Sequence, residues 1–120
     1  MDKKILLVDD AAFMRMLIRN TLTTNGYTNI LEAADGEIAV STYAAEKPDL
    51  VIMDITMPNK TGIEALKEIK EIDPGAKVVM CSAMGQEAMV VEAITLGALD
   101  FLVKPFKAER ILQTVKKILD

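Results

Sequence analysis

Five polar side chains of the sequence combine carboxylate, hydroxyl and ammonium groups at the ends of short apolar runs. They are Asp9, Asp10, Asp54, Ser82 and Lys104. Hard carboxylate oxygens favour Mg²⁺ over zinc or copper, and Mg²⁺ usually takes only one or two carboxylates. A carboxylate left free by the metal can attack phosphorus as a nucleophile. These residue types therefore predict phosphoryl transfer to an aspartate beside a Mg²⁺ ion.

Asp54 is the predicted nucleophile, because it stands alone after its apolar run, whereas Asp9 and Asp10 form a pair. Its phosphorylation would give an aspartyl phosphate. Lys104 and Ser82 would neutralise or hydrogen-bond the phosphoryl oxygens. Closely packed carboxylates raise one another's pKa, so a lysine and a metal ion are needed to offset their charge.

Each of these residues also has an ordinary structural interpretation. Asp9 and Asp10 could be a helix cap and a solvated charge, and Asp54 could belong to a surface turn. Ser82 could be a turn residue and Lys104 a solvated surface residue. An Asp pair directly after a buried strand is costly without a metal, which favours the chemical interpretation.

Five apolar, β-branched runs alternate with segments of helical periodicity. The expected strands cover residues 5–8, 29–33, 50–53, 77–81 and 101–103. The first, third and fourth are almost continuously apolar, as in strands buried on both faces. The alternation indicates a parallel sheet with right-handed crossovers. Five strands favour a single doubly wound (βα)5 domain of the flavodoxin-like α/β class, with strand order 2-1-3-4-5, over an eight-stranded barrel.

Apolar residues at helical spacing mark the five expected helices. In chain order they are Phe13, Met16 and Leu17; Ile38, Ala39 and Tyr43; Ile63, Leu66, Ile69 and Ile72; Met89, Val90, Ala93 and Ile94; and Ile111, Leu112, Val115 and Ile118. Thr61 and Glu64 form a predicted capping box at the start of the third helix. In an open parallel sheet ligands bind beyond the carboxyl ends of the strands, so we expect the five polar residues to meet there.

Composition excludes several functional classes. A chain of 120 residues forms one domain, expected to cover residues 1–120, and 51% hydrophobic residues exclude disorder. One cysteine and no histidine exclude a disulfide scaffold, a Cys/His zinc site and a histidine-based triad. The net charge of −4 argues against nucleic acid as a partner. No run approaches the roughly 20 apolar residues of a membrane span, and no signal peptide is evident, so a soluble cytoplasmic protein is expected.

Four stretches together resemble the signature of response-regulator receiver domains. They are residues 6–10 (LLVDD), 54–58 (DITMP) with Gly62, 82–83 (SA) and 104–106 (KPF). They occur in the right order and at the right spacings over the whole chain. Residues 9–16 and 80–86 are most similar to receivers of the chemotaxis type.

The resemblance implies that Asp54 accepts a phosphoryl group from a phosphohistidine on a partner histidine kinase. Asp10, Asp54 and the main-chain carbonyl of Thr56 would hold Mg²⁺, and Asp9 would act largely through a metal-bound water. Lys104 would pair with the phosphate, and its bond to the following proline would be cis.

The resemblance also implies a conformational switch. Ser82 would move towards the phosphate, and the space it leaves would let the ring of Phe101 turn inward. The surface of the fourth helix, fifth strand and fifth helix would change as a result. Phe101 lacks the hydroxyl of the tyrosine that many relatives carry there. Thr56 and Met84 are expected to set how easily water reaches the acyl phosphate and thereby to tune dephosphorylation.

The expected function is that of a stand-alone, monomeric two-component response regulator without its own output domain, rather than an enzyme. Its expected partners are a CheA-like histidine kinase, a flagellar motor switch protein or other output protein, and a phosphatase. A receiver in a non-chemotaxis phosphorelay is the main alternative, and an adaptor that is never phosphorylated is another.

Two further alternatives belong to other classes. A flavodoxin-type FMN carrier needs a phosphate-cradling loop after the first strand, where Asp9 and Asp10 would repel the phosphate. A phosphohydrolase of the haloacid dehalogenase type places two Asp residues one apart, whereas here they are adjacent.

Overall fold

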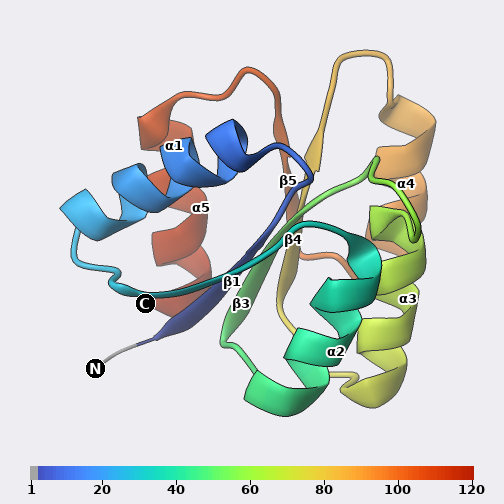
Figure 1. Ribbon diagram of the computed structural model, residues 1–120. Coiled ribbons are helices and arrows are strands. Elements are labelled where there is room, and N and C mark those ends of the chain that lie inside the picture. Colours follow the sequence, from blue (N-terminus) through green and yellow to red (C-terminus); the bar gives the residue numbers. More distant parts are fainter. Residues whose placement is uncertain (1–2) are drawn as a thin grey trace.

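The computed structural model describes residues 3–120, which form a parallel sheet with helices on both faces (Figure 1). Its elements are, in chain order, β1 (Lys4–Val8), α1 (Ala12–Thr24), β2 (Asn29–Ala33), α2 (Gly36–Glu46), β3 (Leu50–Asp54), α3 (Gly62–Ile72), β4 (Val78–Ser82), α4 (Glu87–Thr95), β5 (Asp100–Val103) and α5 (Ala108–Leu119). The strand order is β2-β1-β3-β4-β5, and every neighbouring pair is parallel. The predicted fold class and strand order are confirmed. Met1 and Asp2, which the predicted domain includes, lie outside the described residues.

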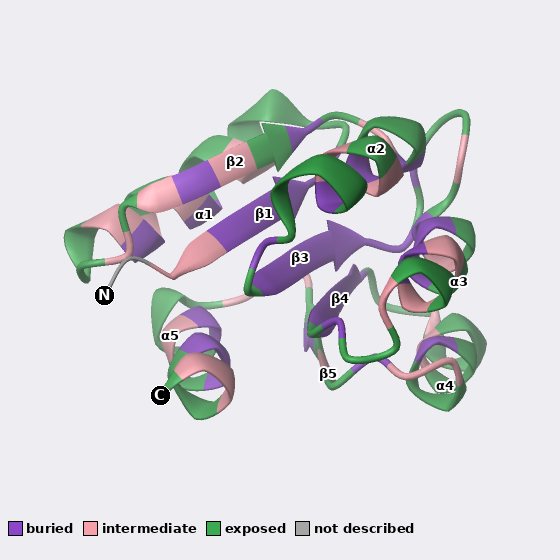
Figure 2. Cartoon of the chain, turned by 90° about the horizontal axis from the view of Figure 1, so that it is seen from below, coloured by how far each residue is buried: buried purple, intermediate pink, exposed green. Residues whose placement is uncertain are grey.

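The two faces of the sheet carry two separate apolar cores. Helices α1 and α5 cover one face, and α2, α3 and α4 cover the other (Figure 1). Within β1 the side chains alternate, so that Ile5 and Leu7 join one core while Leu6 and Val8 join the other. The central strands are therefore buried along almost their whole length (Figure 2). This burial on both faces is the physical reason for their continuous apolar sequence.

The strands that carry the polar residues extend slightly further than their apolar runs. Asp54 is the last residue of β3, and Ser82 is the last residue of β4, one position beyond each predicted end. Asp54 lies opposite Cys81 in the ladder, and Ser82 lies opposite Val103. The main chain of both residues is thus held by the hydrogen bonds of the sheet, and neither residue lies in a loop.

Helix α1 forms where predicted, but its buried face is not the one that marked it in the sequence. Phe13 is 65% exposed and Leu17 is 42% exposed, whereas Ile18 and Leu22 are buried against the sheet. The helix has apolar residues on more than one side, and contact with the sheet decides which of them are covered. In α4, only Ala93 of the four apolar residues that marked the helix is buried.

The start of α3 packs directly onto the end of β3. Thr61 and Glu64 form the predicted capping box, with hydrogen bonds of 3.2 and 3.0 Å. The N–H of Gly62 donates to the carbonyl of Ile55 at 2.8 Å. A Cβ at Gly62 would lie 2.0 Å from the carbonyl oxygen of Asp54, so only glycine fits this approach.

Over residues 3–120, every helix is too short or too polar to cross a membrane.

Candidate functional site

The candidate site lies at the carboxyl edge of the sheet, where the connections after β1 and β3 leave for opposite faces. β1 and β3 are neighbours, yet β1 continues into α1 on one face and β3 into α3 on the other (Figure 1). Diverging connections leave a crevice at the edge of an open parallel sheet, which is where such folds bind ligands. Asp9 and Asp10 follow β1, and Asp54 ends β3, so all three acids face this crevice region.

The three aspartates converge as the sequence predicted. Each offers a carboxylate oxygen, and these oxygens all lie within 4.8 Å of one another. Asp9 is 3% exposed and Asp54 is 8% exposed, whereas Asp10 is open to solvent. Three hard oxygen donors, one of them solvent-accessible, form a donor set that suits a divalent cation such as Mg²⁺. The cluster has the composition of a site for a divalent metal ion.

Lys104 binds two of the three carboxylates. Its Nζ lies 3.0 Å from Asp9 Oδ2 and 3.2 Å from Asp54 Oδ2. The Lys104–Pro105 peptide bond is cis, as expected, and the N–H of Lys104 donates to the carbonyl of Ser82 at 2.7 Å. Lys104 and Asp54 are fifty positions apart in the sequence, yet their side chains are in contact. The predicted proximity of the two residues is confirmed.

The electrostatics of the pair follow from burial and charge. Burial raises the pKa of the Asp54 carboxyl, and the nearby charge of Lys104 offsets this only in part. Burial alone would lower the pKa of Lys104, but its hydrogen bond to Asp9 and the two negative charges outweigh burial, so its pKa is raised. The lysine is thus held in its charged form beside Asp54.

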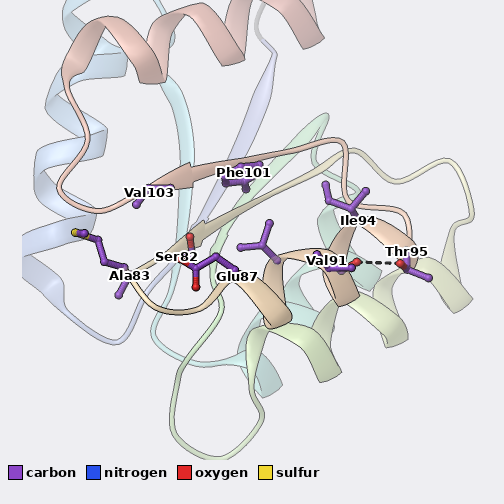
Figure 3. Close-up of a pocket in the computed structure, with 10 residues that line it drawn as sticks. Ser82, Ala83, Glu87, Val91, Ile94, Thr95, Phe101 and Val103 are labelled. Atoms are coloured by element: carbon purple, nitrogen blue, oxygen red, sulfur yellow. Dashed lines mark hydrogen bonds between the residues drawn. The ribbon is translucent and has the colours of Figure 1, made fainter.

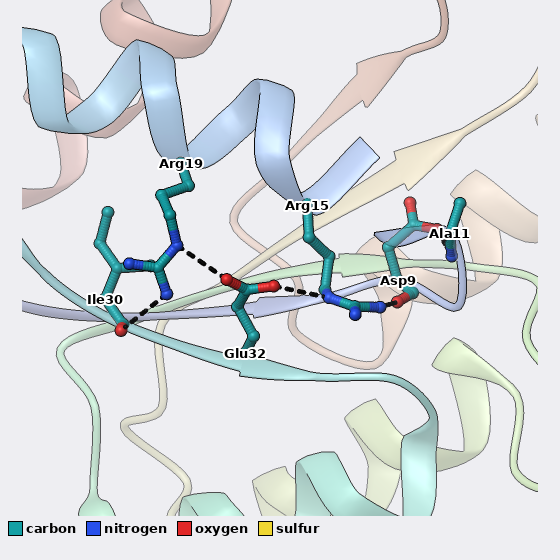
Figure 4. A network of polar contacts seen from close by, with 6 residues as sticks. All are labelled: Asp9, Ala11, Arg15, Arg19, Ile30 and Glu32. Carbon is teal, nitrogen blue, oxygen red and sulfur yellow. Dashed lines mark hydrogen bonds and ion pairs between the residues drawn. The ribbon is translucent and has the colours of Figure 1, made fainter. Parts of the chain in front are cut away.

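Asp9 is held from several sides. Its Oδ1 accepts the N–H of Ala11 at 2.9 Å, and its main-chain carbonyl accepts Arg15 Nη1 at 2.5 Å. Arg15 also pairs with Glu32 of β2 at 2.7 Å, and Arg19 pairs with the same carboxylate at 2.7 Å (Figure 4). The sequence analysis did not identify this network. Its one sequence signal is that the two arginines are four residues apart on one helix face.

The alternative helix-cap role of the Asp pair does not match the structure. The residue at the N-cap of α1 is Ala11, which makes no side-chain capping bond. Asp9 instead bonds the N–H of Ala11 itself and Lys104. Asp9 therefore does not cap the first turn of α1, and its Oδ2 is directed to Lys104 at the site.

Ser82 and Phe101 lie on a shared groove between α4 and β5. Ser82 is buried, and Phe101 is 36% exposed; both line this groove, which has a volume of about 630 Å³ (Figure 3). Val90 and Ile94 of α4 supply part of its apolar lining. Met84 is 83% exposed beside it, and Thr56 is also on the surface.

Gln86 links two loops at the site, and the sequence analysis did not identify it as a site residue. Its Oε1 accepts the N–H of Ala83 at 2.6 Å, and its Nε2 donates to Thr56 Oγ1 at 2.8 Å. Gly85, directly before it, has φ +90°. That glycine is the only local signal for a tight turn at this point.

Comparisons with known proteins agree with this geometry. Residues 5–116 match the family model described as the response regulator receiver domain. The chain is 56% identical to the chemotaxis protein CheY of Bacillus subtilis over 100% of both chains. It is 54% identical to CheY of Thermotoga maritima over 98% of both. The receiver domain of NtrX from Brucella abortus superposes with a TM-score of 0.92 at 36% identity, covering 97% of this chain and 98% of that one.

Proposed function

The chain belongs to the response regulator receiver family, and from this premise we propose that Asp54 accepts a phosphoryl group from a partner histidine kinase. Members of this family are phosphoacceptor signalling proteins rather than enzymes. One observation carries the proposal. Asp54 belongs to the acidic cluster at the carboxyl edge of the sheet, and its carboxylate also contacts Lys104. The FMN-carrier and phosphohydrolase alternatives are set aside by family membership.

The reaction is a displacement at phosphorus. A carboxylate oxygen of Asp54 forms a bond to phosphorus while the P–N bond of the donor phosphohistidine breaks. The electron pair of that bond stays with the imidazole, which takes up a proton on leaving. Lys104 pairs with the phosphoryl oxygens, which requires only a small shift, since its Nζ already lies 3.2 Å from Asp54 Oδ2. Ser82 offers a hydroxyl from the neighbouring strand end.

The residues present fit a Mg²⁺ site. Asp10, Asp54 and the main-chain carbonyl of Thr56 would hold the ion directly. Both carboxylate oxygens of Asp9 already accept hydrogen bonds inside the protein, which supports its contribution through water. When bound, Mg²⁺ supplies positive charge that offsets the carboxylates and the phosphoryl oxygens.

The groove beside Phe101 supports the switch. A partly exposed aromatic side chain that lines an apolar groove can turn inward once Ser82 moves towards the phosphoryl group. That motion would alter the face formed by α4, β5 and α5, which is where an output protein would bind. Thr56 and Met84, both exposed, would control the access of water to the acyl phosphate.

The full-length likeness to CheY proteins makes this chain a chemotaxis response regulator with a kinase partner and an output partner. We propose that the kinase is CheA-like, that the output protein is the flagellar motor switch, and that a phosphatase removes the signal. We propose further that residues 1–120 form the receiver domain and that it works as a monomer in the cytoplasm.

The test is transfer of phosphate to Asp54→Asn. We expect wild type to gain the mass of one phosphoryl group from a phosphorylated kinase, and Asp54→Asn to gain none, because an amide is a poor nucleophile. Asp120→Asn, at the exposed end of α5, is the matched control and should behave as wild type. Chelation of Mg²⁺ should stop the transfer to wild type. Label on Asp54→Asn equal to that on wild type would refute the assignment.

A further inference from the structure

Gln86 joins the two loops that flank Asp54 and Ser82. Its side-chain carbonyl accepts the N–H of Ala83 at 2.6 Å, and its amide NH₂ donates to the hydroxyl of Thr56 at 2.8 Å. Thr56 lies two residues after Asp54, and Ala83 directly follows Ser82. The bridge therefore spans thirty positions of sequence and links the loop after β3 to the loop after β4.

The side chain is used for this bridge and not for the helix that it precedes. Gln86 is the N-cap residue of α4, yet it makes no side-chain capping bond there. Serine, threonine, aspartate and asparagine are the side chains that ordinarily cap a helix at this position, and glutamine is not one of them. The positive φ of Gly85 lets the chain turn back sharply enough for Gln86 to reach Ala83. The side chain of Gln86 thus joins two loops and leaves the first turn of α4 without a side-chain cap.

The bridge also bears on the motion of Ser82. The carbonyl of Ser82 and the N–H of Ala83 belong to one planar peptide unit, so a shift of the Ser82 main chain turns the Ala83 N–H as well. That N–H is committed to Gln86 in the unphosphorylated protein. A movement of Ser82 towards Asp54 would therefore have to break the bridge or drag Thr56 along with it.

We propose that Gln86 is a positioning residue that holds the loop after β4 in its unphosphorylated arrangement by anchoring it to Thr56. This rests on the proposed phosphorylation of Asp54 and adds its regulation. Phosphorylation then has to release the Gln86 bridge, so the bridge opposes activation in the absence of a phosphoryl group.

The experiment measures the initial rate at which acetyl phosphate, with Mg²⁺ present, adds a phosphoryl group to the whole chain, followed by mass spectrometry. Gln86→Ala and Gln86→Met remove the bridge and should each raise the rate about fivefold, the effect of a hydrogen bond of ordinary strength. Gln113→Ala, which removes the other glutamine of the chain from an exposed position on α5, is the matched control and should leave the rate unchanged.

Thr56 provides the second half of the test. Thr56→Val removes the hydroxyl that accepts the hydrogen bond from Gln86 and should raise the rate like Gln86→Ala. The Gln86→Ala/Thr56→Val double variant should be no faster than the faster single variant, because both remove one bridge. A merely structural role would lower thermal stability without this pattern of rates.

The outcomes separate the two proposals. Wild type that gains no phosphoryl group on Asp54 from either acetyl phosphate or the kinase would overturn the proposed function, and the role of Gln86 with it. A labelled wild type with unchanged rates in both Gln86 variants would overturn the role of Gln86 alone. Additive effects in the double variant would do the same.

Discussion

The ammonium group of Lys104 lies within the acidic cluster, beside the carboxylates that a metal ion would also approach. Its Nζ contacts Asp9 at 3.0 Å and Asp54 at 3.2 Å, so one ammonium group partly neutralises two of the three carboxylates. A divalent ion entering the same cluster meets less negative charge than it would without the lysine. The lysine should therefore favour the phosphoryl group and oppose the metal.

This gives a prediction for Lys104→Met. The variant should bind Mg²⁺ more tightly, on the order of tenfold, because the competing positive charge is gone. Calorimetric titration with MgCl₂ measures the affinity. Lys107→Met removes an exposed lysine of the same loop and should bind Mg²⁺ as wild type does. Weaker or equal binding by Lys104→Met would contradict the competition.

Tyr43 carries a second prediction at the residue scale. Its hydroxyl donates to Asp73 Oδ2 at 2.9 Å, and burial, together with the hydrogen bond to this carboxylate, raises the pKa of Tyr43 to about 12. The folded-state pKa lies above that of the unfolded chain, about 10. The resulting stabilisation is complete below about pH 10 and is lost as the pH rises towards 12.

Tyr43→Phe should therefore be less stable than wild type at neutral pH, by about 1 kcal/mol for the lost hydrogen bond. The difference in free energy of unfolding should shrink as the pH rises above about 10, because only wild type must then ionise a tyrosine held back by the fold. Urea unfolding at a series of alkaline pH values measures this. A gap that stays constant over that range would count against the contact.

At the scale of elements, the junction of β3 and α3 fixes the position of Asp54. Gly62 approaches the carbonyl oxygen of Asp54 so closely that a Cβ would lie 2.0 Å from it. The capping box of Thr61 and Glu64 then directs α3 away from the site. The glycine in the receiver signature is thus explained by backbone packing beside Asp54.

Gly62→Ala should consequently destabilise the fold by about 1–3 kcal/mol, because backbone has to move to accept the methyl group. Gly75→Ala is the matched control, since its Cβ would meet no atom closer than 3.4 Å and should change stability little. Urea denaturation gives both values. If the two variants had the same free energy of unfolding, the β3–α3 junction would accommodate the methyl group without loss of stability.

At the scale of the whole molecule, the acidic cluster couples cation binding to folding. Asp9, Asp10 and Asp54 are brought together only in the folded chain, so an ion bound at this cluster stabilises that state by mass action. The overall charge of −4 adds a general attraction for cations, which salt screens. Cation binding at the acidic cluster can be separated from this general attraction by experiment.

We expect Mg²⁺ to raise the midpoint of thermal unfolding of wild type by more than NaCl of equal ionic strength does. Asp10→Asn should lose most of this excess, because it removes the most accessible carboxylate of the cluster. Asp120→Asn has the same change in charge away from the site and should keep it. An equal rise with NaCl and Mg²⁺ in wild type would show that no specific cation site forms.

The sequence by itself determined the order of the elements and the identity of the site. Short, continuous apolar runs bounded by turn residues favour strands buried on both faces, and a parallel sheet brings the residues after those runs to one edge. The convergence of Asp54, Asp9 and Lys104 follows from these two rules, and the structure confirms it. Each rule acts through local periodicity or general topology, which a single sequence contains.

Only the tertiary structure decided which helix faces are covered and which side chains reach across the site. Phe13 and Leu17 share the helical spacing of buried residues, yet contact with the sheet buries Ile18 and Leu22 instead. The bridge from Gln86 depends on the path of two loops, which no periodicity encodes. Contacts between segments far apart in sequence are set by the packed backbone, since spacing along the chain gives no measure of distance across it.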